Sequence, residues 1–298
     1  MTSAYIGRFA PSPSGALHFG SLLAALASFL DARAHNGRWL LRIEDLDPAR
    51  EPPGAAQQIL ETLTDFGFSW DGPVLYQSQR INEYHRILDE LRSRQLIYPC
   101  DCSRQRLREL DSIYDNHCRH RTDVSSPYAL RLQLPDTRLA FEDRIQGHYA
   151  QDLVKDCGDV VLLRRDGLVA YQLAVVVDDA MQGVTDVVRG YDLIDSTPRQ
   201  IALQQILGLP TPRYAHIPVA SNQQGLKLSK QNFASALDGR QASRYLREAL
   251  KFLGQDLQTL PQREKPAIVL EWAIERWDIQ RVPKLANIPV RDHPGQAF

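Results

Sequence analysis

The sequence lacks long apolar runs, and it lacks an excess of charge of either sign. No apolar stretch approaches the roughly 18 residues that a membrane-spanning helix needs, so we expect no membrane partner. The net charge of −1 excludes a chain that is basic throughout, and any contact with nucleic acid then requires a local basic surface. The first residues, MTSAYIGRF, also lack the basic start and apolar core of a signal peptide. We therefore expect a cytoplasmic protein.

Cysteine is scarce, with 4 in 298 residues. Three of the cysteines cluster: Cys100, Cys102 and Cys118. In a reducing compartment such a cluster favours a metal site over disulfides, although three unligated thiols remain the alternative. The residue types alone nominate His117 or His120 as a fourth ligand, because imidazole binds zinc far more often than a phenol does. Cys157 lies apart from the cluster, and we expect it in the core.

The common nucleotide-binding fingerprints GxxxxGK[ST] and GxGxxG are also missing. Instead, RFAPSPSGALHFGS leads into apolar residues with the spacing of a helix that buries one face. These residues are Phe19, Leu22, Leu23, Leu26 and Leu30. Strands are expected at 5–10 and at 39–43, and Asn36 and Gly37 are typical of a helix end. This βαβ order predicts a parallel sheet.

The rest of the chain alternates between helical and strand-like sequence patterns. We expect helices at 47–66, 80–95 and 193–207, strands at 160–163 and 170–177, and mostly helical structure from 225 to 277. Residues from about 98 to 150 have broken periodicity and hold the cysteine cluster and many arginines, which indicates an inserted module. We find no internal repeat and no low-complexity tract.

The loop before the first helix suits a phosphate. A helix N-terminus offers unpaired backbone N–H groups and a partial positive charge. Gly15 and Gly20 allow a ligand to approach the backbone, and His18 can donate a hydrogen bond. A plain strand-to-helix turn is the alternative. A distant segment, GLKLSKQ at 225–231, supplies Lys227 and Lys230 and favours the phosphate site.

These segments resemble a known family. HFGS at 18–21 is similar to the HIGH signature of class I aminoacyl-tRNA synthetases, and KLSKQ at 227–231 to their KMSKS signature. RFAPSPSG, LLRIEDLDP and VVRGYDLIDSTPRQ resemble segments of the glutamyl-tRNA synthetases. The resemblance covers about residues 5–255. It departs at Ser21, where HIGH has its second histidine, and at Gln231, where KMSKS ends in serine. The first departure leaves the histidine chemistry to His18.

The resemblance is closest to a truncated branch of that family, because too little sequence follows KLSKQ for a full anticodon-binding domain. It implies an α/β fold: a Rossmann-like class I synthetase catalytic domain with an inserted zinc-containing module and a mostly helical C-terminal domain. The implied division has four parts. They are the two catalytic halves at 1–97 and 159–224, the inserted module at 98–158, and the KMSKS-like loop with helices at 225–298.

The resemblance also implies the site residues. Those implied for glutamate are Arg8, Ala10, Ser12, Glu44, Tyr171 and Arg189. Those implied for ATP are Pro11, His18, Gly20, Ser21, Lys227 and Lys230, of which His18 and Lys230 are the catalytic pair. The family pattern C-x-C…Y-x-x-x-C implies the zinc ligands Cys100, Cys102, Tyr114 and Cys118, so here Tyr114 replaces the histidines.

The chemistry of the implied glutamate residues fits independently. Glu44 can hold an ammonium group, and the guanidinium groups of Arg8 and Arg189 can clamp carboxylates. Tyr171 can close one wall and donate its hydroxyl. The alternatives are a solvated acidic turn around Glu44, an ion pair of Arg189 with Asp186 or Asp192, and a core role for Tyr171.

The implied reaction is the ATP-dependent activation of L-glutamate to glutamyl-adenylate, followed by transfer to queuosine in the anticodon of tRNA(Asp). Mg²⁺ would accompany ATP, one Zn²⁺ per chain would be structural, and we expect a monomer. Two arginine clusters are candidate RNA-facing surfaces. The first comprises Arg104, Arg106, Arg108, Arg119 and Arg121, and the second Arg240, Arg244, Arg247 and Lys251.

Three rival hypotheses remain open from the sequence. The first is a short glutamyl-tRNA synthetase that charges the tRNA acceptor end. The second is an RNA-binding paralogue without catalysis, and the third, more distant, is a nucleotidyltransferase with HxGH-like chemistry.

Overall fold

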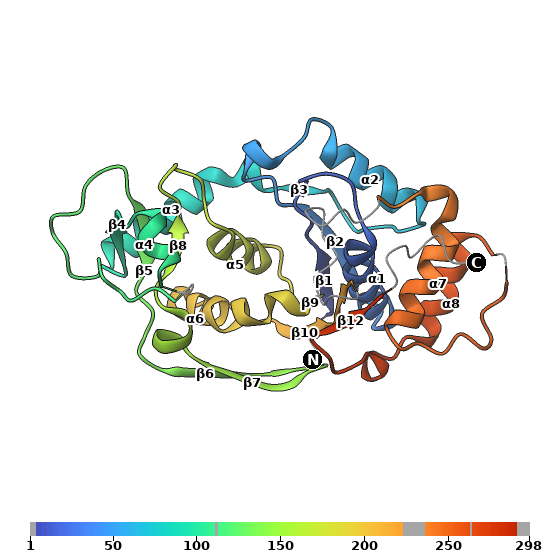
Figure 1. Ribbon diagram of the computed structural model, residues 1–298. Helices are drawn as coiled ribbons and strands as arrows, with labels where there is room; N and C mark the ends of the chain where they lie inside the picture. Colours follow the sequence, from blue (N-terminus) through green and yellow to red (C-terminus); the bar gives the residue numbers. More distant parts are fainter. Residues whose placement is uncertain (1–3, 111–112, 223–235, 263, 291–298) are drawn as a thin grey trace.

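The computed structural model describes residues 4–110, 113–222, 236–262 and 264–290. The molecule is elongated, with parallel strands at its centre, a module around β4, β5 and α4 at one end, and helices α7 and α8 at the other (Figure 1). Within the described residues, no helix has the length and apolar character that a membrane crossing requires.

The central strands are parallel, as predicted from the βαβ order. β1 (Ile6–Phe9), β2 (Arg38–Ile43) and β3 (Leu75–Tyr76) form one sheet in the order β1-β2-β3. β9 (Asp186–Gly190) pairs with β10 (Arg213–Ile217). β9 lies against β1, where the Thr185 backbone N–H donates to the Ile6 carbonyl at 2.9 Å. The carboxyl ends of β1, β2 and β9 therefore share one edge, where open parallel sheets bind ligands.

Helix α1 (Phe19–Ala34) connects β1 to β2 and confirms the predicted helix. The His18 side chain caps its N-terminus, since Nδ1 accepts the Ser21 backbone N–H at 3.3 Å. Just beyond its C-terminus, Asn36 adopts a positive φ of 53°. At Gly37 a β-carbon would lie 2.5 Å from the Tyr5 carbonyl oxygen, so only glycine fits this close passage.

The helix predicted at 47–66 is wrong in its first part. The structure has a 3-10 turn at Pro48–Arg50, and the helix α2 covers only Ala55–Asp65. Pro52 and Pro53 break the helix, because proline cannot donate to it and disfavours helical backbone in the preceding residue. The predicted helix at 193–207 likewise begins later: α6 is Thr197–Leu207, after a 3-10 turn at Tyr191–Ser196.

The strand predicted at 170–177 is also wrong. This segment opens the helix α5 (Tyr171–Met181), which is buried from Leu173 to Asp179. A helix buried on all sides shows no apolar periodicity, and its three consecutive valines resemble a strand. The helix α3 (Ile81–Ser93) and the strand β8 (Val160–Leu163) confirm their predictions.

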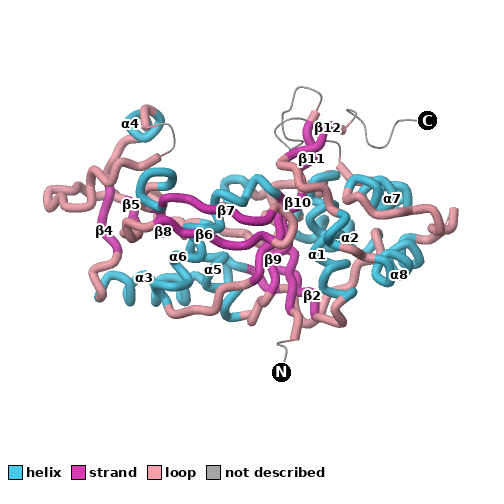
Figure 2. Tube along the Cα trace, turned by 90° about the horizontal axis from the view of Figure 1, so that it is seen from below, coloured by secondary structure: helices cyan, strands magenta, loops and turns pink. Residues whose placement is uncertain are grey.

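The region between α3 and α5 forms a separate sheet and a long hairpin. β4 (Ile97–Cys100), β5 (Ala129–Leu132) and β8 form an antiparallel sheet, with the short helix α4 (Arg104–Arg108) nearby. β6 (Arg138–Asp143) and β7 (Gly147–Asp152) form a hairpin that reaches back to the central strands (Figure 2). At its tip the Arg144 backbone N–H donates to the Tyr214 carbonyl in β10 at 2.9 Å.

Within the stretch predicted as mostly helical, 225–277, the structure describes residues 236–262 and 264–277, with α7 (Ala242–Phe252) and α8 (Pro266–Arg276). Both pack against α1 within one apolar cluster, where the Phe252 ring meets the Phe19 ring edge-on at 6.0 Å. β11 (Val219–Ser221) pairs with β12 (Asn287–Pro289), so the last described strand returns to the segment that directly follows β10.

Candidate active site

A pocket of about 570 Å³ opens at the shared edge of β1, β2 and β9, beside the N-terminus of α1. It gathers every described residue that was predicted to bind glutamate or ATP. These are Arg8, Ala10, Pro11, Ser12, His18, Gly20, Ser21, Glu44, Tyr171 and Arg189. Lys227 and Lys230 lie outside the described residues.

The loop between β1 and α1 is held against the end of β2. The Glu44 backbone N–H donates to the Pro11 carbonyl at 3.0 Å, and Gly15 has a φ of 131°, which a side chain would disfavour. Because Nδ1 of His18 accepts the cap hydrogen bond, neutral His18 carries its proton on Nε2. His18 can therefore donate a hydrogen bond from Nε2, as the phosphate hypothesis requires.

The chain on both sides of the lysine segment borders this pocket. Val219 and Ala220 line the pocket before the segment. After it, Ala236 forms an antiparallel bridge with His18, and the Leu237 backbone N–H donates to the Leu17 carbonyl at 3.0 Å.

A buried carboxylate organises the glutamate side of the pocket. Asp179 of α5 accepts from Arg8 at 3.2 Å and from Arg42 at 2.8 Å, and all three side chains are buried. Such a charge is tolerated only when it is paired. Part of the Arg8 guanidinium is therefore occupied by Asp179. The sequence did not predict this contact.

The Glu44 side chain is only 9% exposed and is not part of a solvated acidic turn. Its Oε1 lies 3.5 Å from Nη2 of Arg42 and has no hydrogen-bond donor among the described residues. Burial raises the pKa of Glu44 to about 7, against the opposing charges of Arg42 and Arg8. A carboxylate oxygen without a donor, at a ligand-sized pocket, is suited to an ammonium group.

Arg189 is held by neutral groups. It donates from Nη1 to the Tyr171 hydroxyl at 3.2 Å, from Nη2 to Thr197 Oγ1 at 2.8 Å, and from Nε to His216 Nε2 at 3.1 Å. Of the two alternative ion pairs, the one with Asp186 does not form, while Asp192 lines the same pocket as Arg189. Asp186 instead pairs with Arg144 at 3.3 Å and with Arg213 at 2.9 Å. Burial raises the pKa of the Tyr171 hydroxyl, so it stays protonated and can donate into the pocket.

The sequence did not reveal four of the groups that position these side chains. They are Arg42, Asp179, Thr197 and His216. The adjacent Asp178 and Asp179 after an apolar run were a usable signal, because buried acids need partners. The mistaken strand at 170–177 hid that signal.

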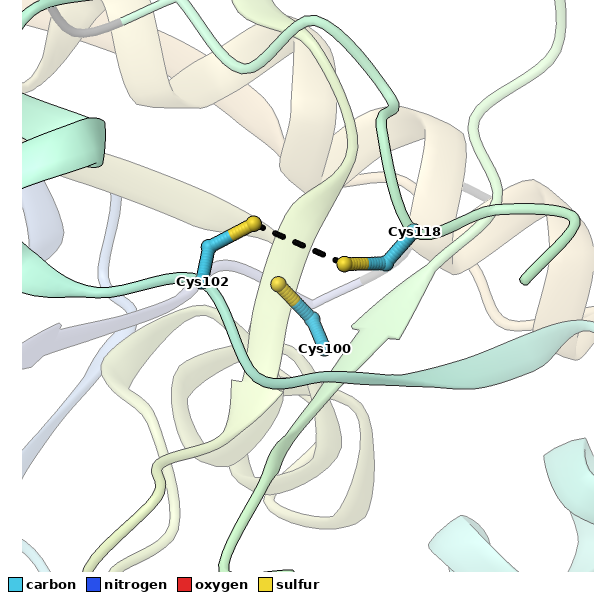
Figure 3. A group of neighbouring side chains, drawn as sticks. All are labelled: Cys100, Cys102 and Cys118. Carbon is cyan, nitrogen blue, oxygen red and sulfur yellow. Dashed lines mark hydrogen bonds between the residues drawn. The ribbon is translucent and has the colours of Figure 1, made fainter. Parts of the chain in front are cut away.

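The three cysteines that were predicted to bind zinc lie together (Figure 3). The sulfur atoms of Cys100, Cys102 and Cys118 lie within 4.8 Å of one another, and those of Cys102 and Cys118 are 3.5 Å apart. Tetrahedral zinc with bonds of about 2.3 Å places sulfur atoms about 3.8 Å apart, so the three thiols fit one zinc ion.

The Tyr114 hydroxyl lies among these thiols. It is 3.4 Å from Cys100 Sγ and 3.7 Å from Cys102 Sγ, and it accepts the Cys118 backbone N–H at 2.9 Å. Within the described part of the chain, neither His117 nor His120 joins the cluster. The geometry thus favours the phenol oxygen over imidazole as a fourth donor. Cys157 lies in a separate apolar cluster, as expected.

The arginine cluster of the inserted region is largely paired with carboxylates. Arg106 contacts Asp115 at 2.6 Å and Arg121 contacts Asp101 at 2.9 Å. Arg119 pairs with the buried Asp159. This favours a structural role for these three arginines and reduces the candidate RNA-facing surface to Arg104 and Arg108. In the second cluster, Arg240 and Arg244 pair with Asp238 and Glu248.

The fold and the pocket together define a class I synthetase catalytic core. Residues 6–255 match the family described as tRNA synthetases class I (E and Q), catalytic domain, and the chain belongs to this family. It is similar to a glutamate-tRNA synthetase structure from Elizabethkingia anophelis, with a TM-score of 0.79 and 24% identity. That match covers 97% of this chain and 68% of the other, and it shows the fold alone.

More similar relatives carry a more specific name. The chain is 52% identical to the Glutamyl-Q tRNA(Asp) synthetase of Neisseria meningitidis serogroup C (strain 053442), over 96% of this chain and 99% of that protein. It is 50% identical to the Glutamyl-Q tRNA(Asp) synthetase of Pseudomonas aeruginosa PAO1, over 97% of this chain and 99% of that protein.

Glutamate binding should release a proton below neutral pH. With a pKa of about 7, the Glu44 carboxyl is mostly protonated at pH 6 and must ionise to hold an ammonium group. Calorimetry in buffers of different ionisation enthalpy should show release of about one proton per glutamate at pH 6 and almost none at pH 8. Affinity should accordingly fall as the pH drops below 7.

The substitution Glu44→Gln should abolish both the release and most of the affinity. Glu61→Gln, on the exposed side of α2, is the matched control and should behave like the wild type. Binding at pH 6 without proton release would contradict the role of Glu44.

The purified chain should contain about one zinc ion. Elemental analysis should find zinc lost in Cys118→Ser and retained in Cys157→Ser, whose thiol is buried outside the cluster. Tyr114→Phe should lose zinc to a chelator faster than the wild type, because it lacks the fourth donor. Zinc retention in Cys118→Ser, or equal loss in Cys157→Ser, would refute this assignment.

Proposed function

We propose that this chain activates L-glutamate with ATP and transfers it to queuosine in the anticodon of tRNA(Asp). The observation that carries the proposal is a single pocket beside a capped helix N-terminus. In it, Oε1 of Glu44 has no hydrogen-bond donor among the described residues, and the Arg189 guanidinium is already oriented. The names of relatives that are 50% and 52% identical over nearly the full length support the choice of acceptor.

The pocket chemistry complements glutamate. Glu44 would hold the α-ammonium, and Arg189 and the remaining donor of Arg8 would bind carboxylates. Tyr171 would donate its hydroxyl from the wall, and Ala10 and Ser12 would contact the amino acid from the loop after β1. Glutamine carries no second carboxylate, so it would leave a buried arginine donor unpaired and should be rejected.

The α1 N-terminus would receive the nucleotide. Backbone N–H groups near Gly20 and Ser21, the Nε2–H of His18 and the loop at Pro11 would contact ATP. We assign Lys230, and secondarily Lys227, to the phosphates, on the family resemblance. A glutamate carboxylate oxygen attacks the α-phosphorus, and the bond to the β-phosphate breaks to release pyrophosphate. The substrate is itself the nucleophile, so the protein contributes positioning and charge stabilisation.

In the second step a hydroxyl of the queuosine cyclopentenediol attacks the carbonyl carbon of glutamyl-adenylate, loses its proton, and AMP leaves. Mg²⁺ would travel with ATP. The zinc ion held by Cys100, Cys102, Tyr114 and Cys118 would be structural, since it lies apart from the pocket.

We also propose that the chain divides into four parts, with boundaries after residues 97, 158 and 224. It would act as a monomer, in the cytoplasm where ATP and tRNA are found.

The test is glutamylation of tRNA pools with and without queuosine, using labelled glutamate, ATP and the wild-type chain. Label should enter only the pool that contains queuosine, and nuclease digestion should release it with the queuosine nucleoside. Removing the 3′ end of the tRNA should leave labelling intact. Label at the 3′ end of queuosine-free tRNA would instead establish the rival, a short glutamyl-tRNA synthetase.

A further inference from the structure

We propose that Asp143 and His216 form a positioning pair that fixes the orientation of Arg189 for the substrate carboxylate. This inference rests on the proposed function, since it assigns Arg189 to glutamate. Neither residue lines the pocket, and both are fully buried behind it. They act through Arg189, which lies next to His216 in the register of β9 and β10.

The hydrogen bonds determine the tautomer of His216. A guanidinium only donates, so Nε2 of His216 must accept from Nε of Arg189 at their distance of 3.1 Å. The Thr197 hydroxyl lies 3.2 Å from the same nitrogen and can donate to it as well. The proton of the neutral ring then lies on Nδ1, which donates to Asp143 Oδ2 at 2.6 Å. A protonated ring would place a second N–H against the guanidinium, so the observed arrangement requires neutral His216.

Asp143 is itself fixed by the backbone of the β6–β7 turn and of β10. Its Oδ1 accepts the backbone N–H groups of Ile145, Gln146 and His216 at 3.0, 2.9 and 3.1 Å. These three donors hold Oδ1 in place and leave Oδ2 for the imidazole. The tip of a hairpin from the inserted region therefore determines which nitrogen of a central-sheet histidine carries the proton.

Arg189 connects the Asp143–His216 pair to the pocket. Its Nε is fixed by His216 and its Nη2 by Thr197, while Nη1 lies beside the Tyr171 hydroxyl on the pocket wall. A guanidinium oriented before the substrate arrives loses less freedom when a carboxylate binds. Glutamate affinity should therefore depend on the tautomer of His216, whereas ATP affinity should not.

The substitution Asp143→Asn reverses the tautomer with little change in shape. The three backbone donors keep the amide oxygen at the Oδ1 position, so the amide NH₂ faces Nδ1 of the ring. The ring must then accept at Nδ1 and carry its proton on Nε2, where Thr197 Oγ1 at 3.2 Å can accept it. The Nε–H of Arg189 loses its acceptor, so Arg189 is no longer held in one orientation, and we expect glutamate affinity to fall about tenfold or more.

The chain offers a matched control on the same hairpin. Glu142, the neighbour of Asp143, contacts Nδ1 of His148 at 2.8 Å, but both side chains of this pair are exposed. Glu142→Gln makes the same chemical change beside a histidine and should leave the kinetics unchanged. In glutamate-dependent ATP–pyrophosphate exchange, Asp143→Asn should raise the glutamate KM about tenfold or more and keep the ATP KM within about twofold.

A second measurement identifies the tautomer of His216 directly. Long-range ¹H–¹⁵N spectra of the ¹⁵N-histidine protein should show neutral His216 protonated at Nδ1, and spectra of Asp143→Asn should show it protonated at Nε2. An unchanged glutamate KM, an equal rise in both KM values, or wild-type His216 protonated at Nε2 would overturn the inference.

The two proposals can fail separately. Absence of glutamate-dependent exchange in the wild type would refute the proposed function, and the His216 spectrum would still decide the positioning pair. The same spectrum decides it if Asp143→Asn does not fold.

Discussion

The site depends on one buried carboxylate, Asp179, that joins three elements of the sheet edge. It draws Arg8 from β1 and Arg42 from β2 toward α5, and Arg42 in turn contacts Glu44. Burying these charges is favourable only while each has a partner. The pairing therefore fixes the relative position of the strand ends, and through them the loop that leads to His18 and the wall that carries Tyr171.

The same burial gives the pocket its two kinds of recognition group. Burial raises the pKa of Glu44 to about 7, and its Oε1 has no hydrogen-bond donor among the described residues, so this carboxylate is suited to bind a cation. Arg189 is oriented by a histidine, a hydroxyl and a phenol, so its charge is not cancelled by the contacts that hold it. A cavity with one anion and an aimed cation complements an amino acid that carries an ammonium group and two carboxylates.

The sequence predicted the groups that would touch a ligand better than the groups that hold them. The loop residues before Phe19 and the apolar spacing of α1 predicted a phosphate site, because helix starts and the ends of parallel strands have recognisable local sequence patterns. The ten described residues implied for glutamate and ATP all line one pocket. Lys227 and Lys230 remain predictions. The cysteine spacing predicted the cluster of three thiols.

The supporting contacts escaped prediction because they join distant parts of the chain. Asp179 lies 171 residues from Arg8 and His216 lies 73 from Asp143, and no local pattern encodes such pairs. The strand predicted at 170–177 failed because a helix buried on every side has no amphipathic period. The first part of the helix predicted at 47–66 failed because Pro52 and Pro53 cannot continue a helix, so α2 begins only at Ala55.

The most direct test of the account is a crystal structure of the chain with L-glutamate bound. The account predicts the α-ammonium within hydrogen-bonding distance of Glu44 and a carboxylate on Arg189, with Arg189 still donating to His216 and Thr197. Glutamate bound outside this pocket, or bound with its ammonium away from Glu44 and Arg189 displaced, would contradict it.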